Sequence, residues 1–214
     1  MPSDSLFHWA RLRTNGRNFT ALAEQLVSTT LPALSSLGGK PWAVANGLFG
    51  FWTNELLLVT TWPRAADAST LLTPNLPEGA EIVEQHNFVA TARPVDDTPL
   101  SSPGLYVHRF FEVRNADVDR FVALSEEAWN TFENTSEYAA QPQGLFCQRD
   151  RSDESGLMLL VTWYDRFESW ERSRTPPPEA ETNFRARAML TRRSMAFATR
   201  LVGTGGAPRG MGPA

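Results

Sequence analysis

The sequence repeats itself at about half its length. Residues 47–49 (GLF) and 57–62 (LLVTTW) return as residues 144–146 (GLF) and 159–163 (LLVTW), and residues 89–91 are echoed by residues 197–199. This period is far longer than the roughly 20–50 residues of solenoid repeats. A chain of 214 residues has room for two units of about 100 residues, each with its own core. The repeat therefore predicts two similar folding units.

In the first half, hydrophobic periodicity predicts the element order β-α-β-β-α-β. A strand with two alternating faces is expected over Leu6 to Arg13, and a helix follows that Asn18 can cap and Pro32 bends. The remaining elements are strands over 42–52 and 55–62, a short helix over 65–72 and a strand over 81–92. This order is that of ferredoxin-like folds.

The second half repeats this order after a segment rich in proline. Strands are predicted over 105–113, 144–149, 157–163 and 195–202, and helices over 118–132, where Asp117 can cap the start, 167–174 and 179–191. The predicted organisation is a first unit at 1–95, a linker at 96–104, a second unit at 105–202 and a disordered tail at 203–214.

Each unit alone would leave one apolar face of its sheet bare, and such a face must be covered. The obvious cover is the other unit. The predicted fold class is therefore α+β: two tandem ferredoxin-like units whose antiparallel sheets pack into a barrel within one chain. If the faces that carry Arg11 and Glu112 meet inside this barrel, the two residues would form an ion pair between the halves, because buried charges must be paired; the alternative is two unrelated charges at the rim.

Composition excludes several classes of function. The formal net charge of −4 argues against a nucleic-acid partner, which would require concentrated positive charge. No apolar run is long enough to span a membrane, and we expect a cytoplasmic protein. The single cysteine, Cys147, excludes an intrachain disulfide and is predicted to be a buried apolar residue.

The residues of the second half resemble the dimeric α+β barrel superfamily, and its NIPSNAP-type members most of all. The resemblance rests on residues 106–113, on 159–170 and on the arginine-rich helix before the last strand, and it extends more faintly over 6–93. It implies a pocket between the sheet and its helices. It also implies relatives that include cofactor-free monooxygenases acting on polyaromatic substrates, haem-binding and haem-degrading enzymes, and isomerases.

Three residues are the candidates for catalysis. His108 or His8 would be the base, since imidazole suits proton transfer near neutral pH, and Arg109 would stabilise an oxyanion. The repeat pairs His8 with Arg109 and His108 with Phe7, so the two histidines are expected on opposite faces of their sheets. For both, a structural strand histidine is the competing interpretation.

Three further residues are the candidates for substrate binding. Trp62 and Trp163 end equivalent strands and would wall a pocket for planar ligands, unless they are core residues. His86 is the third candidate. Three scattered histidines do not predict a metal site or a cofactor, and no histidine falls on a predicted helix to bind haem.

The resemblance, together with these candidate residues, implies a cofactor-independent monooxygenase-type enzyme for a small planar or aromatic molecule. The alternative is a non-catalytic module that binds a small ligand or another protein, and a haem-binding protein is the least favoured reading. Whether the chain is an enzyme at all is left open by the sequence. Assembly into a homo-oligomer is also expected, because the outer edges of such barrels are available for pairing.

Overall fold

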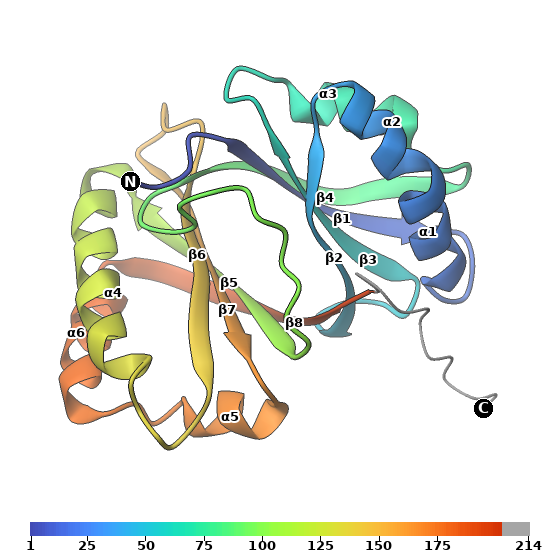
Figure 1. Ribbon diagram of the computed structural model, residues 1–214. Helices are drawn as coiled ribbons and strands as arrows, with labels where there is room; N and C mark the ends of the chain where they lie inside the picture. Colours follow the sequence, from blue (N-terminus) through green and yellow to red (C-terminus); the bar gives the residue numbers. More distant parts are fainter. Residues whose placement is uncertain (203–214) are drawn as a thin grey trace.

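Eight antiparallel strands close into one barrel in the computed structural model, which describes residues 1–202 (Figure 1). Around the barrel the strands follow the order β1-β3-β2-β8-β5-β7-β6-β4. The halves β4-β1-β3-β2 and β8-β5-β7-β6 are two ferredoxin-like sheets, joined where β2 pairs with β8 and β4 pairs with β6. The predicted fold class is confirmed. The predicted disordered tail, 203–214, lies outside the described residues.

The first unit contains the predicted elements with one irregularity in its long helix. The N-cap residue of the helix is Phe19, and the predicted cap Asn18 lies one residue earlier, where its side chain accepts a hydrogen bond from the Thr20 amide at 3.0 Å. The helix widens into a π-helical stretch just before Pro32, a residue that cannot donate a backbone hydrogen bond. The elements are β1 (Leu6–Thr14), α1 (Thr20–Gln25), η1 (Leu26–Thr30), α2 (Leu31–Ser36), β2 (Lys40–Phe49), β3 (Glu55–Trp62), α3 (Ala68–Leu72), η2 (Thr73–Asn75) and β4 (Ala80–Ala90).

The second unit follows the same order, and its second crossover consists of two helices. The predicted cap at Asp117 is wrong in its chemistry, because this carboxylate accepts from Arg114 Nε at 2.8 Å instead of bonding the helix backbone. The elements are β5 (Leu105–Arg114), η3 (Asn115–Asp117), α4 (Val118–Phe132), β6 (Ala140–Gln148), β7 (Ser155–Tyr164), α5 (Phe167–Arg172), α6 (Pro178–Met189) and β8 (Thr191–Leu201).

Strand pairing fixes which residues of the two units are equivalent. Residues 57–60 and 159–162 share the sequence LLVT, and His8 lies opposite Thr60 while Val107 lies opposite Thr162. His8 therefore corresponds to Val107, two residues from the register expected from the sequence. Both units also carry an irregularity after a matching proline, at Pro41 and Pro142. The origin of the units by duplication stays a prediction.

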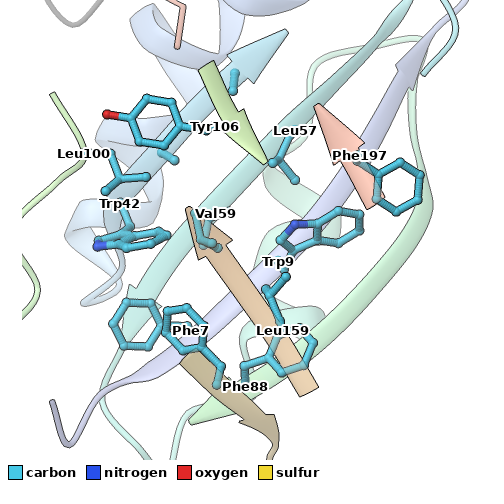
Figure 2. Packing of buried hydrophobic residues seen from close by; sticks show 14 of the residues in the cluster. Phe7, Trp9, Trp42, Leu57, Val59, Phe88, Leu100, Tyr106, Leu159 and Phe197 are labelled. Atoms are coloured by element: carbon cyan, nitrogen blue, oxygen red, sulfur yellow. The ribbon is translucent and has the colours of Figure 1, made fainter. Parts of the chain in front are cut away.

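The inside of the barrel is filled by side chains of both units (Figure 2). Phe7 and Trp9 of β1 meet the partner unit directly, since the ring of Phe7 lies 4.8 Å from that of Phe146 and Trp9 lies 5.1 Å from Phe110. Leu100 of the predicted linker is also buried there, where its amide donates to the Trp42 carbonyl at 2.8 Å. Apolar contacts across the barrel axis therefore hold the two sheets together.

The predicted ion pair between the halves is wrong. Arg11 lies 3.2 Å from Glu84 of its own unit, and Glu112 accepts a hydrogen bond from Arg193 of β8, which also belongs to its own unit. Each charge is near a barrel end and is satisfied by a neighbouring strand, so neither has to be paired across the axis.

The outer faces of the two sheets are covered by separate helical layers. In the first unit, β1 and β3 contribute Leu6, Ala10, Leu12, Leu56 and Leu58 to a closed apolar layer with the helices. In the second unit, α4 and α6 pack side by side over β5 and β7 (Figure 1). Cys147 is buried among the apolar residues of this layer, as predicted. No helix within residues 1–202 has the length and apolar character needed to cross a membrane.

Candidate functional site

A cavity of about 580 Å³ lies in the second unit, between the outer face of its sheet and the helices α4 and α6. Strands β5 and β7 form its floor, and α6 together with the segment between α5 and α6 forms its rim. Its aromatic wall consists of Phe111, Trp129, Phe132, Tyr164 and Phe184, and its basic residues are Arg109, Arg174, Arg185, Arg187, Arg192 and Arg193.

The sequence of α6 explains why this layer is not filled. The buried residues of this helix are Ala180 and Arg187, and Phe184 is its one large apolar side chain packed against the layer. The helix begins at the last of three consecutive prolines, and this run separates it from α5. An amphipathic helix with large apolar residues would close the space that α6 leaves open.

Arg187 reaches from α6 into the layer and is only 7% exposed. Its guanidinium donates to Ser125 Oγ of α4 at 3.1 Å and lies 4.8–5.3 Å from the ring centres of Phe111, Phe121 and Phe184. Burial and, to a lesser extent, the positive charge of Arg109 together lower the pKa of Arg187 from 12.5 to about 10. The side chain is still a cation at neutral pH.

Arg109 and Tyr164 lie on the strand floor of the cavity. The half-buried Arg109 points to the helical side of β5, as Val107 and Phe111 do, and burial lowers the pKa of its guanidinium. Burial raises the pKa of the Tyr164 phenol, although the nearby positive charge of Arg109 opposes this shift. Tyr164 is therefore protonated at neutral pH and can donate a hydrogen bond to a ligand.

The two predicted catalytic histidines lie on opposite faces of the barrel wall, as expected. His8 faces the helical layer of the first unit, where Nδ1 lies 2.9 Å from Asn87 Oδ1, and burial lowers its pKa. His108 faces the barrel interior, and burial alone lowers its pKa from 6.5 to about 3. Neither residue lines the cavity, and only Arg109 of the three predicted catalytic residues does.

The predicted ligand-binding residues are also dispersed. Trp62 is fully buried in the outer layer of the first unit, while Trp163 packs against the barrel interior and donates to the Pro103 carbonyl at 3.1 Å. The two tryptophans are not equivalent. Trp62 lies opposite Leu6, and Tyr164 lies opposite Leu105, the residue that corresponds to Leu6. Because the first unit has an extra threonine at residue 61, the counterpart of Trp62 is Tyr164. His86 lies 2.9 Å from Glu84 and beside Trp9.

Sequence reasoning missed most of the residues that line the cavity. Trp129 and Phe132 read as the apolar face of α4, and Arg187 read as part of an arginine-rich helix. The available signal was the weak apolar face of this helix, because a helix that packs on a sheet with few large apolar residues leaves space beneath it.

The donor set of the cavity does not fit a histidine-bound haem. Across residues 1–202, His8, His86 and His108 all lie on strands and none lines the cavity. A haem of this kind needs one accessible axial imidazole. In the same part of the chain, no three potential metal ligands of the His, Cys, Asp or Glu type lie together.

Comparison with known proteins identifies the fold. No family model and no curated protein sequence matches the chain. Among solved structures, an anthrone oxidase-like protein superposes with a TM-score of 0.63 at 10% identity, covering 94% of this chain and 92% of its own. A putative monooxygenase from Fusobacterium nucleatum gives 0.57 at 10% identity, with 94% of each chain covered.

A mutant chlorite dismutase from Candidatus Nitrospira defluvii gives a TM-score of 0.63 at 10% identity, covering 95% of this chain and 93% of its own. These likenesses extend over nearly the whole chain, and they agree with the expected dimeric α+β barrel architecture. Because the identities are so low, they establish the fold alone.

Proposed function

We propose that this protein is a cofactor-independent monooxygenase-type enzyme that acts on a small planar or aromatic molecule in the cavity of the second unit. The observation that carries the proposal is the aromatic wall of a cavity of about 580 Å³. Ligand sites of about 300–1,000 Å³ are typical of small-molecule pockets. The names of structural neighbours, which include an anthrone oxidase-like protein and monooxygenase-like proteins, support the same reading.

In such a reaction the substrate supplies all the electrons. A CH₂ group of the substrate loses both hydrogens, one oxygen atom of O₂ becomes its carbonyl oxygen, and the other oxygen atom leaves with the two hydrogens as water. The step that the protein can assist is ionisation of the substrate before it meets O₂. Arg109, the predicted oxyanion residue, lies in the cavity and would stabilise the negative charge that forms on the substrate oxygen.

Tyr164 adds a neutral hydrogen-bond donor to the same floor, since burial keeps its phenol protonated. The aromatic side chains of Trp129 and Phe132 would hold the flat face of the substrate by stacking. No histidine of residues 1–202 lines the cavity, so the proton released from the substrate is expected to pass to water in the cavity mouth.

Several expectations from the sequence stay predictions: the NIPSNAP-type relationship, the cytoplasmic location, the lack of a nucleic-acid partner and assembly into a homo-oligomer. The proposed roles of His8 and His108 as base, and of Trp62, Trp163 and His86 in binding, also stay predictions. A ligand-binding module without turnover is the alternative that the same cavity would serve.

Oxygen consumption with anthrone as the substrate tests the proposal. Ala188 lines the cavity from the exposed side of α6, so Ala188→Trp is expected to fill the entrance and to lower the rate by at least about tenfold. The matched control is Ala186→Trp, which adds the same indole to the same helix at a position that does not line the cavity.

Wild-type protein that consumes no oxygen above the rate of anthrone alone would rule out this reaction. An equal loss of rate in both tryptophan variants would show that the reaction occurs elsewhere in the molecule.

A further inference from the structure

The arginines around the cavity fall into two groups. Those at the rim have carboxylate partners: Arg185 pairs with Glu181, Arg192 with Glu154 and Arg193 with Glu112. Those that reach inward, Arg109 and Arg187, form no ion pair with any carboxylate of residues 1–202. The exposed Arg174 lies close enough to Arg109 to lower its pKa.

Two inward-facing cations without a counter-charge are costly. Taking a charge out of water is unfavourable unless an opposite charge or several hydrogen bonds compensate it. Here Arg187 has one hydrogen bond, to Ser125, and Arg109 forms none within the described residues. The lowered pKa of each guanidinium, caused first by burial and then by a neighbouring arginine, is the expected mark of this arrangement.

The surroundings of Arg187 keep its guanidinium in place for a ligand. The rings of Phe111, Phe121 and Phe184 lie within 5.3 Å of it, and the Ser125 hydroxyl accepts from Nη1. A guanidinium fixed in this way has further N–H groups, which suit the oxygen pair of a carboxylate. Arg109 lines the same cavity from β5, and it is close enough for its charge to lower the pKa of Arg187.

We infer that the cavity binds a planar aromatic acid whose carboxylate pairs with Arg109 and Arg187 while its rings lie against the aromatic wall. This inference rests on the proposed function, which makes the cavity the binding site, and it adds the charge of the ligand. The protein supplies the two cations and the ligand supplies the missing negative charge. Neutral aromatic molecules would fit the wall but would leave both guanidinium groups without a partner.

Calorimetric titration at pH 7 and low salt, with 2-naphthoate and 2-naphthamide as probes, tests the inference. The two share the same ring system and differ in charge. A charge-assisted hydrogen bond contributes enough to expect 2-naphthoate to bind at least about tenfold more tightly than 2-naphthamide. Arg109→Met should remove most of this difference, and Arg109→Lys should retain part of it.

Arg192→Met is the matched control, because it removes an arginine that also lines the cavity but is paired with Glu154. It should change the affinity for 2-naphthoate by less than about threefold, as expected for an exposed charge. Cooperative thermal unfolding of each variant shows that it is folded. Arg109 is chosen for substitution because its removal leaves no hydrogen-bond partner unsatisfied within residues 1–202.

Equal affinity for the two probes, no binding of either, or equal losses in Arg109→Met and Arg192→Met would overturn the inference. The outcome is separate from that of the proposed reaction. Binding of 2-naphthoate through Arg109 without oxygen consumption would contradict the proposed reaction and support the anion site. Anthrone oxidation without a preference for 2-naphthoate over 2-naphthamide would support the proposed reaction and contradict the anion site.

Discussion

The helical layers on the two halves of the barrel start from similar sheets and end in different structures. In the first unit, the outer face of β1 and β3 is sealed by apolar side chains. In the second unit, the corresponding face of β5 and β7 is the floor of a cavity of about 580 Å³. One unit therefore has a closed apolar layer on its sheet, and the other has a layer that contains a cavity.

Single residues at equivalent positions account for much of this difference. Ala10 lies opposite Leu58 and Arg109 lies opposite Leu160, so the small apolar residue of one unit is replaced by a cation in the other. Trp62 is likewise replaced by Tyr164. The buried indole of Trp62 donates to Thr60 of its own strand, whereas the phenol of Tyr164 lies at the cavity.

The largest effect on stability is expected when the arginine found at position 109 in the second unit is introduced at the equivalent position of the first unit, Ala10. Ala10 has no exposed surface, so Ala10→Arg forces a cation into an apolar layer without a partner. We expect a loss of about 4 kcal/mol or more in the free energy of unfolding. Urea denaturation followed by tryptophan fluorescence measures it.

Ala10→Met separates the charge from the size of the new side chain, and overpacking by this residue should cost about 1–3 kcal/mol. If Ala10→Arg costs no more than Ala10→Met, the first layer has room or a counter-charge for a cation. The contrast between the two units would then fail.

The faces of the two sheets that point into the barrel can be compared in the same way, and the expected effect on stability is smaller. Trp9 lies opposite Val59 and His108 lies opposite Val161, so His108 takes the place of a buried indole. Its folded-state pKa, about 3, is below the ordinary 6.5, so the unfolded chain binds the proton more tightly. Stability is therefore complete above about pH 6.5 and falls as the pH drops toward the folded value.

Protonation of His108 in the unfolded chain should lower the free energy of unfolding of the wild-type protein by about 2 kcal/mol between pH 7 and pH 5. His108→Leu should lack this part of the pH dependence. Chemical denaturation of both proteins at the two pH values measures the difference. Phe110→Leu, a neighbouring interior change without a titratable group, should lower stability equally at both. An unchanged pH dependence in His108→Leu would mean that this imidazole is protonated or solvated in the folded protein.

The sequence was sufficient for the fold because periodicity and turn residues act locally. The alternating faces of residues 6–13 and the unbroken apolar run at 56–59 predict strands whatever their partners are. The exact register between the units could not be predicted, because the GLF segments at 47–49 and 144–146 do not occupy equivalent positions. Asn46 lies opposite Leu56, and Cys147 lies opposite Met158, the residue equivalent to Leu56. Asn46 therefore corresponds to Cys147, which follows the second GLF segment instead of preceding it.

The site was predicted only at Arg109, and the reason is physical. The histidines and Trp62 have the chemistry of a site, but burial and facing depend on the partner unit and on the helices that cover each sheet. Arg187 was covered only as part of an arginine-rich helix, because nothing in the spacing of α6 shows that this arginine turns inward. A cavity is the space that side chains fail to fill, and periodicity does not report it.

The smallest predicted effect has an unusual sign. In the ligand-free protein, Arg109 makes no ion pair or hydrogen bond within residues 1–202, and the charges of Arg174 and Arg187 oppose its own. Arg109→Met should therefore raise the free energy of unfolding by about 1 kcal/mol, since a residue kept for binding is often unfavourable for stability. Thermal and urea unfolding without ligand measure the gain.

Arg93→Met is the matched control for this last change. The Arg93 guanidinium lies 4.9 Å from the ring centre of Trp129, a residue that lines the cavity, but it pairs with Glu133 at 2.7 Å and donates to the Pro142 carbonyl. Its removal should lower stability by about 1 kcal/mol, because two partners lose their hydrogen bonds. If both substitutions destabilise the protein alike, Arg109 is a packing residue. The helical layer of the second unit would then contain more empty space than that of the first unit, but Arg109 would stabilise the fold as the apolar residues of the first layer do.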